Sequence, residues 1–324
     1  MEKLLEISNL KVYFELNRSL FGKPKIVHAV DDVSFTVYAG ETLGIVGESG
    51  CGKSSLARAL VGLNKITDGK VLFLGTTDLA KANSDSWQSL HQQIQFIFQD
   101  PIASLNPRMT VAEIIAEPLR AYHRSLSQNQ IQQKVLETMR LVGLSETQIN
   151  RYPQEFSGGQ CQRIGIARSL ILAPKLIICD ESVSALDASI KAQIINLLQE
   201  LQQKLNLTII FISHDLSVVR HICHRILVMY LGNIMELATN EVLYQQKRHP
   251  YTQALLSAVP IANPKLERAK VFKPLEGELP SSLTPPKGCV FSTRCPLADD
   301  RCKASRPPLY SFSDGALVAC FKVV

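Results

Sequence analysis

The stretch Gly47-Glu48-Ser49-Gly50-Cys51-Gly52-Lys53-Ser54 decides the fold of this chain. It follows an apolar strand pattern at 43–46 and precedes a short helix pattern. Glycines in such a loop let backbone N–H groups surround phosphate oxygens at a helix N-terminus. Lys53 is placed to reach the outer phosphates, and the Ser54 hydroxyl to bind Mg²⁺, with Ser55 beside it. The stretch predicts an ATP or GTP site rather than a plain glycine turn with a solvated lysine.

Composition limits the class of protein. A chain of 324 residues predicts about two domains, and 46% hydrophobic with 20% charged residues is ordinary for a soluble globular protein. The net charge of +6 is scattered along the chain and gives little support for a nucleic-acid or membrane-surface partner. Residues 1–16 mix charges among apolar positions, and no run approaches the ~18 apolar residues of a membrane span. We therefore expect a cytosolic chain with reduced thiols.

Periodicity divides the chain into regions. Alternation at 5–7, 12–14 and 33–37 predicts a β-rich N-terminal layer, and a further strand at 94–98 ends at Gln99. The polar, helix-prone segment 111–144 predicts a helical insertion, within a helical subdomain of about 100–172.

Ser157-Gly158-Gly159-Gln160 has the spacing of a capping box and predicts a helix that continues to Leu172. Two glycines in a first turn cost helix stability. They make sense if the positive end of the helix must approach an anion closely. A helix start with incidental glycines is the other interpretation.

Leu176-Ile177-Ile178-Cys179-Asp180-Glu181 predicts a buried parallel strand that ends in two carboxylates. Ligand sites of open α/β sheets lie beyond the carboxyl ends of their strands, so both acids are expected near the phosphate loop. Asp180 suits a hold on Mg²⁺, and Glu181 can accept a proton from an attacking water. A helix-capping Asp-Glu pair is the alternative.

Two further polar residues follow apolar segments. Asp187 can cap the helix predicted at 188–205, whose apolar residues recur at helical spacing. His214 stands after the apolar strand at 208–213, where a histidine is either structural or in reach of a γ-phosphate.

In this order, the phosphate loop, Gln99, FSGGQ at 156–160, LIICDE at 176–181, SALD at 184–187 and His214 resemble the nucleotide-binding subunit of an ATP-binding cassette transporter. The likeness covers about residues 1–258. It implies an α/β fold with a β-rich N-terminal layer, a RecA-like parallel-sheet core and a helical subdomain.

The resemblance implies roles for these residues. Two such domains dimerise head to tail, so ATP held by Lys53, Ser54, Gln99 and Asp180 of one chain would meet Ser157, Gly158, Gly159 and Gln160 of the other. Glu181 would polarise the water, His214 would contact the γ-phosphate, Asp187 would link the two sites, and Gln99 would report nucleotide state to a membrane subunit. Phe14 aligns with the aromatic ring that stacks on adenine, with Tyr13 or a core role as alternatives.

One position departs from the family pattern. Ser182 follows Glu181 where the family usually has proline. A proline would fix φ at this turn, so serine is expected to loosen the geometry of Glu181 while activity survives.

The last part of the chain differs in composition. Proline is dense from Pro250 onward, and 258–287 resembles an extended connector. Beyond it lie four cysteines, whose spacing matches neither zinc-ribbon nor ferredoxin patterns: Cys289, Cys295, Cys302 and Cys320. Four free or structural thiols are one interpretation, since cysteine is also a common buried apolar residue.

HPYTQALL, PPKGCVFSTRCP and the closing VAC resemble the C-terminal extension of oligopeptide and dipeptide permease ATPases, particularly the second ATPase of such systems. In that family the four cysteines can hold a [4Fe-4S] cluster. The expected division is a nucleotide-binding domain at 1–258 and a Pro-rich connector with a Cys-rich extension at 259–324.

The resemblance implies an importer ATPase on the cytoplasmic face of the membrane, with ATP and Mg²⁺ as cofactors. Its partners would be two permease subunits, a paralogous ATPase or a second copy, and indirectly a peptide-binding protein, with no nucleic acid. Nickel chelates and peptide antibiotics remain alternative cargoes. A soluble cassette ATPase acting on nucleic acid or ribosomes is less consistent with one cassette and no heptads. A redox-sensing regulatory subunit is a third possibility.

Overall fold

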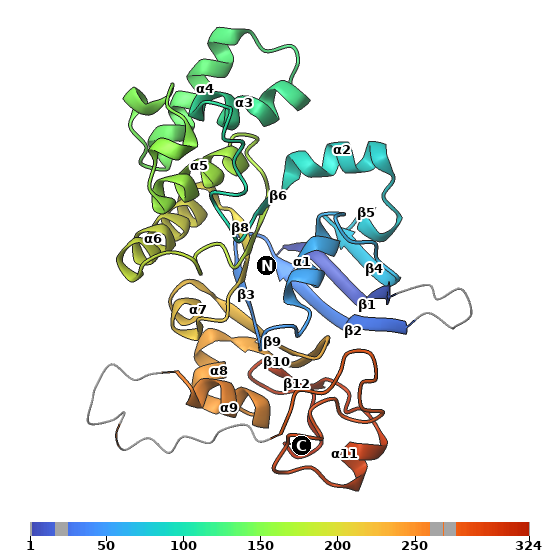
Figure 1. Cartoon of the computed structure of the whole chain (residues 1–324). Helices are drawn as coiled ribbons and strands as arrows, with labels where there is room; N and C mark the ends of the chain where they lie inside the picture. Colours follow the sequence, from blue (N-terminus) through green and yellow to red (C-terminus); the bar gives the residue numbers. More distant parts are fainter. Residues whose placement is uncertain (1, 17–24, 260–267, 269–276, 324) are drawn as a thin grey trace. The chain divides into compact units, whose positions relative to one another are not determined.

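The computed structural model describes residues 2–16, 25–259, 268 and 277–323. The chain divides into two compact units. Unit 1 consists of Met1–Glu2, Tyr38–Thr42 and Ala82–Ser213, and unit 2 of Lys3–Val37, Leu43–Lys81 and His214–Val324. Figure 1 shows the elements of both. Most of the connector expected at 258–287 lies outside the described residues.

Unit 2 contains two groups of strands. One sheet has the order β2-β1-β4-β5, formed by β1 (Lys3–Leu16), β2 (Lys25–Tyr38), β4 (Asp68–Phe73) and β5 (Thr77–Asp78). The other group has the order β11-β12-β10-β9-β3 and uses β3 (Thr42–Val46), β9 (Arg225–Tyr230), β10 (Asn233–Thr239), β11 (Tyr310–Ser311) and β12 (Leu317–Val318). The β-rich N-terminal layer is thus confirmed.

A bulge explains why the alternation in β1 suggests two strands in the sequence. Asn9 has a φ of 49°, and the register against β4 shifts between Ser8 and Lys11. The extra residue keeps Ile7 before the bulge and Leu10 after it in the core, although their spacing breaks the period of two.

Four helices and a short fifth complete unit 2. They are α1 (Lys53–Leu60), α7 (Leu216–Ile222), α8 (Asn240–Gln246), α9 (Pro250–Ser257) and α11 (Asp300–Ala304), among the described residues. α9 begins with His249 as its N-cap and Pro250 at its first position, where a missing N–H costs nothing. The buried Glu236 of β10 accepts hydrogen bonds from the N–H groups of Arg248 and His249, which fixes the start of α9.

Unit 1 combines three parallel strands with helices. β8 (Thr208–Ile212), β7 (Leu176–Asp180) and β6 (Ile94–Ile97) lie in that order. β7 pairs in parallel with both neighbours, and every residue of β7 and β8 is buried. Continuous apolar runs are expected for parallel strands covered on both faces, so the predicted buried parallel strand is confirmed.

The helices of unit 1 are α2 (Ser84–Gln93), α3 (Val111–Tyr122), α4 (Gln128–Leu141), α5 (Gly158–Leu170) and α6 (Ala188–Leu205), with short 3₁₀ turns between some of them. α3 and α4 confirm the helical insertion, and both pack with α5. α5 carries the predicted capping box: Gln160 N–H donates to Ser157 Oγ, and Ser157 N–H donates to Gln160 Oε1.

The two glycines that open α5 differ in their surroundings. A Cβ at Gly159 would lie 2.3 Å from Ile190 Cγ2 of α6, far inside contact distance. A Cβ at Gly158 would meet Leu186 Cδ2 at an ordinary 3.5 Å. Packing within the chain therefore explains why residue 159 must be glycine. It does not explain the glycine at 158, where a side-chain methyl group would fit.

We expect Gly159→Ala to destabilise the protein by about 1–3 kcal/mol, because the methyl group overpacks the α5–α6 contact. Urea unfolding followed by circular dichroism measures this. Gly158→Ala is the matched control and should unfold close to the parent. Equal destabilisation by both substitutions would contradict this account of the helix start.

Candidate functional site

The residues predicted for the site fall into two groups, one in each unit. Unit 2 contains Phe14, the phosphate loop at 47–54 with Ser55, and His214. Unit 1 contains Gln99, the signature 157–160, Asp180, Glu181 and Asp187.

The phosphate loop depends on backbone conformations that only glycine takes easily. Gly52 has a φ of 103°, and a Cβ there would lie 2.0 Å from the carbonyl oxygen of Ala29. Gly50 has a φ of 78°. These values allow the chain to turn sharply between β3 and α1. The loop therefore follows the strand and opens the helix, as the sequence predicts.

Lys53 lies within the loop and is only 5% exposed. Its ammonium group donates hydrogen bonds to the carbonyl oxygens of Gly47, at 2.8 Å, and Glu48, at 2.9 Å. Ser54 and Ser55 are half-buried in the first turn of α1. The loop thus gathers a cation and hydroxyl groups at a helix N-terminus, an arrangement suited to a phosphate with its metal ion.

The neighbouring aromatic residues of β1 have different environments. Tyr13 packs against the His28 ring at a centroid distance of 4.3 Å, and its hydroxyl donates to Asp31 at 2.5 Å. Burial and this hydrogen bond raise the pKa of Tyr13. Phe14 is 36% exposed. Of the two, Phe14 has the ring surface open to a ligand.

Asp180 and Glu181 stand at the carboxyl end of β7. Asp180 is 3% exposed, and Glu181 has a φ of 46°. The main chain of Glu181 is held on both sides: its N–H donates to Ile212 O at 3.1 Å, and its carbonyl accepts from Ser184 Oγ at 2.8 Å. These bonds hold the main chain of Glu181 at the turn that leads to Ser182.

Gln99 lies two residues beyond β6 and is exposed. Its side-chain amide donates to Glu181 Oε2 at 3.4 Å. Parallel β6 and β7 present their carboxyl ends at the same edge, so the structure brings these two predicted site residues together.

Asp187 occupies the N-cap position of α6, but its side chain makes no capping hydrogen bond and is exposed. The capping interpretation therefore explains why Asp187 stands at the start of α6, but gives no role to its carboxylate. His214 is exposed and precedes Asp215, whose side chain caps α7 through the N–H groups of Ser217 and Val218.

The four cysteines of the tail line one small pocket: Cys289, Cys295, Cys302 and Cys320. Burial raises the pKa of the Cys289 thiol to about 11 and also raises those of Cys295 and Cys320. Across the described residues, no group of three or more His, Cys, Asp or Glu is arranged to hold a metal ion. The four thiols therefore line the same pocket but are not arranged to bind one metal ion.

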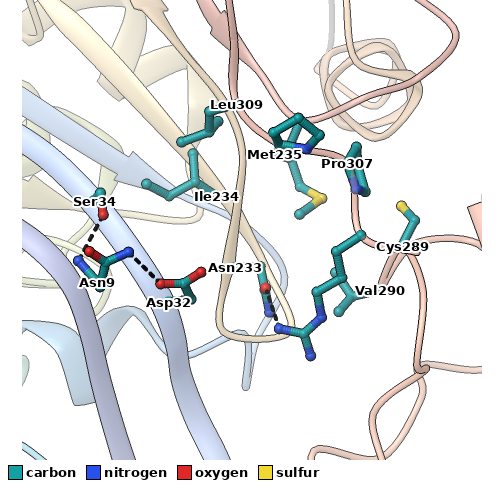
Figure 2. Close-up of a pocket in the computed structure, with 13 residues that line it drawn as sticks. Asn9, Asp32, Ser34, Asn233, Ile234, Met235, Cys289, Val290, Pro307 and Leu309 are labelled. Atoms are coloured by element: carbon teal, nitrogen blue, oxygen red, sulfur yellow. Dashed lines mark hydrogen bonds between the residues drawn. The ribbon is translucent and has the colours of Figure 1, made fainter. Parts of the chain in front are cut away.

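A second pocket of about 280 Å³ shares Cys289 with the first. Figure 2 shows Asn9 hydrogen-bonded to Ser34 and Asp32 on one side, with Cys289 and Pro307 across the pocket. Arg306 also lines it and donates to Asp31 at 2.6 Å. Because Asp31 of β2 also accepts from Tyr13, the segment around Arg306 is linked to both β2 and β1.

Sequence reasoning missed three residues of this region: Tyr251, Arg294 and Arg306. The Tyr251 hydroxyl accepts a hydrogen bond from Glu48 N–H at 2.9 Å, and Arg294 Nη1 donates to Glu48 Oε2 at 2.8 Å. The motifs around Tyr251 and Arg294 are visible in the sequence, but nothing local connects them with a loop some 200 residues earlier.

Two family patterns match the chain. One, described as ABC transporter, matches residues 30–184. The other, described as oligopeptide/dipeptide transporter, C-terminal region, matches residues 235–302. No helix in the described part of the chain is long and apolar enough to cross a membrane.

Curated relatives match over nearly the whole length. The oligopeptide transport ATP-binding protein OppF of Haemophilus influenzae is 57% identical over 100% of this chain and 98% of its own length. OppF of Escherichia coli is 57% identical, covering 99% of this chain and 96% of its own length. The dipeptide transport ATP-binding protein DppF of Escherichia coli is 47% identical, covering 99% and 95%.

Solved structures agree with the fold. A dimeric ATP-binding cassette in a post-hydrolysis state, bound to ADP and Pi, has a TM-score of 0.65 and 27% identity, covering 73% of this chain and 99% of its own. The structure of cbiO1 from Clostridium perfringens, part of an ABC transporter complex, gives the same TM-score and identity, covering 76% and 92%. With its α/β cassette fold and these full-length relatives, the chain belongs to the ATP-binding subunits of oligopeptide and dipeptide ABC transporters.

Proposed function

We propose that this chain hydrolyses ATP to energise the uptake of oligopeptides or dipeptides through a membrane permease. The observation that carries the proposal is the presence, in one chain, of an ABC transporter region and the peptide-transporter C-terminal region, with 57% identity to OppF proteins along its length. The names of these relatives favour peptides over nickel chelates or peptide antibiotics as cargo. They also favour transport over action on nucleic acid or ribosomes.

The phosphate loop is proposed to bind ATP with Mg²⁺. The backbone N–H groups of 47–54 would surround the phosphates, Lys53 would neutralise the outer ones, and Ser55 would contact them from the first turn of α1. Ser54, Gln99 and Asp180 are proposed as the residues that hold Mg²⁺. The burial of Lys53 inside the loop supports this assignment. Because its ammonium group is already largely removed from water, little further desolvation would be needed when a phosphate binds.

Glu181 is proposed as the base that orients and deprotonates the attacking water. The support is its fixed main chain and the hydrogen bond from Gln99, which hold the carboxylate at the end of β7. Gln99 would then sense the nucleotide and the water together. His214 is proposed to contact the γ-phosphate.

Phe14 is proposed to stack on the adenine ring, since Tyr13 is already engaged with His28 and Asp31. The signature Ser157, Gly158, Gly159 and Gln160 is proposed to contact ATP held by a partner cassette, with Asp187 linking the two sites. The room around Gly158 and the uncapped carboxylate of Asp187 support this, because packing within the chain accounts for neither.

The proposed assembly is a head-to-tail pair of cassettes, with a paralogous ATPase or a second copy, docked on two permease subunits at the cytoplasmic face of the inner membrane. An extracytoplasmic peptide-binding protein would deliver the cargo. The chain would divide into a nucleotide-binding domain at 1–258, built on a RecA-like core, and a Pro-rich connector with a Cys-rich extension at 259–324. The similarity to a cassette solved as a dimer supports the pairing.

Cys289, Cys295, Cys302 and Cys320 are proposed to hold a [4Fe-4S] cluster. Four thiolates are the donor set of such clusters, and the four side chains line one pocket. Each thiolate of a cluster binds a different iron, so the ligands need not converge on one ion. When bound, the cluster would supply a redox-active centre and tie the extension together.

Replacing OppF in an Escherichia coli strain with this chain should restore uptake of a labelled tripeptide, given the 57% identity over the whole length. Initial uptake rates measure this, with Lys53→Ala as the inactive control. A chain that is produced normally and restores no uptake would argue against the peptide-importer proposal.

Glu181→Gln should leave MgATP affinity unchanged and lower kcat by about 10²- to 10⁴-fold, because the carboxamide cannot accept a proton. Calorimetric titration and a phosphate-release assay separate the two quantities. Lys53→Ala should instead lose affinity. Normal turnover in Glu181→Gln would reject this residue as the base.

Protein purified without oxygen should show a broad absorption at about 400 nm and contain about four irons per chain. Replacing the four tail cysteines by serine should remove both, while Cys223→Ser, at a buried thiol of unit 2, should retain them. Colourless, iron-free parent protein would exclude the cluster.

A further inference from the structure

Glu48, the second residue of the phosphate loop, is held through both its main chain and its side chain. Its N–H donates to the Tyr251 hydroxyl at 2.9 Å. Its carboxylate accepts a hydrogen bond from Arg294 Nη1 at 2.8 Å. Both partners belong to the part of unit 2 that follows β10. We call Glu48, Tyr251 and Arg294 the Glu48 clamp.

The clamp is largely removed from water. The Arg294 side chain is 9% exposed and that of Glu48 is 28% exposed, whereas Tyr251 is fully buried. Burial weakens solvent screening, so this ion pair interacts more strongly than one on the surface. Removing one partner would leave the other charge poorly solvated.

Aromatic packing fixes the positions of the two residues that bind Glu48, Arg294 and Tyr251. The rings of Tyr230, Tyr251 and Phe291 form a cluster with centroid distances of 4.8–5.4 Å. The Arg294 guanidinium lies 5.9 Å from the centroid of Tyr230, and its Nη1 lies 3.5 Å from the Tyr230 hydroxyl. The arginine therefore reaches the phosphate loop from a rigid base.

Charge gives the clamp a consequence for nucleotide binding. A carboxylate in the phosphate loop lies close to where the phosphates of a nucleotide would bind and repels them. Arg294 neutralises that carboxylate, and the Tyr251 hydroxyl fixes the main chain of Glu48 by accepting its N–H. The loop can then present its N–H groups without a competing negative charge.

We propose that Arg294 and Tyr251 are positioning residues, through which the C-terminal extension and the start of α9 set the affinity of the phosphate loop for MgATP. This inference rests on the proposed role of the phosphate loop. Arg294 directly precedes Cys295, so the same segment carries a proposed cluster ligand and the clamp cation. The C-terminal region thus contributes to ATP binding through Glu48.

A second ion pair, Arg248–Asp314, serves as a matched control for an arginine whose role is only structural. Arg248 donates to Asp314 at 2.7 Å, with side-chain exposures of 18% and 29%, and lies over the Phe312 ring at 4.4 Å. This pair resembles Arg294–Glu48 in geometry, burial and aromatic contact. Its acceptor, Asp314, lies in the extension and not in the phosphate loop.

The test measures MgATP dissociation constants of the full chain by calorimetry. Arg294→Met should weaken binding about tenfold, equivalent to roughly 1.4 kcal/mol, and Arg248→Met less than about twofold. Glu48→Gln completes the set of single variants for the cycle. In the double variant Arg294→Met/Glu48→Gln, affinity should recover to within about threefold of the parent, because the unneutralised carboxylate is gone.

Two further variants define the cause. Arg294→Lys keeps the charge and should retain most of the affinity, whereas Tyr251→Phe removes the acceptor of the Glu48 N–H and should weaken binding. Equal affinities of Arg294→Met and Arg248→Met, or no recovery in the double variant, would overturn the inference. Lys53→Ala distinguishes failure of the phosphate-loop assignment from failure of the clamp. Normal MgATP affinity in Lys53→Ala would remove the phosphate-loop assignment itself. Lost affinity in Lys53→Ala together with parental affinity in Arg294→Met would remove only the clamp.

Discussion

The absence of space beside Gly52 is the constraint on which unit 2 depends. A side chain there would collide with the Ala29 carbonyl of β2 at 2.0 Å. The loop is closed further by a hydrogen bond from Gly232 N–H, in the β9–β10 turn, to Cys51 O at 2.9 Å. The phosphate loop is therefore enclosed by segments far apart in sequence, and each of them can influence the shape that a phosphate meets.

Unit 1 solves a different problem, which is to hold a carboxylate at a strand end without proline. Glu181 takes a left-handed conformation that costs energy for a non-glycine residue, and main-chain hydrogen bonds to Ile212 and from Ser184 compensate for it. Gln99 from the neighbouring strand end then contacts the carboxylate. The position of the carboxylate is well defined because β7, which directly precedes Glu181, and its neighbour β8 are buried along their whole length.

The C-terminal region connects the peptide-transporter family pattern to the chemistry of the cassette. Its cysteines line one pocket, Arg306 donates to Asp31, which also accepts from Tyr13, and Arg294 donates to Glu48 in the phosphate loop. One partner in each pair, Asp31 and Arg294, is only 9% exposed, and a buried charge is costly unless it is paired, so both ion pairs favour this position of the C-terminal region. A family-specific segment can thereby modify an ATP site whose own motifs are common to many transporters.

The sequence by itself determined the phosphate loop, the buried parallel strand ending in Asp180, the capped helix at Ser157 and the helical insertion, because each depends on neighbouring residues and a local period. It could not separate Phe14 from Tyr13, or Gly158 from Gly159, since those choices depend on which side chains stand opposite. The alternation predicts two strands where β1 is one, because the bulge at Asn9 interrupts its period. Only the tertiary structure decided the Glu48 clamp. Arg294 and Glu48 are 246 residues apart, and hydrogen bonds from both to the same aromatic cluster, Arg294 to Tyr230 and Glu48 to Tyr251, bring them into contact in a way that no local pattern records.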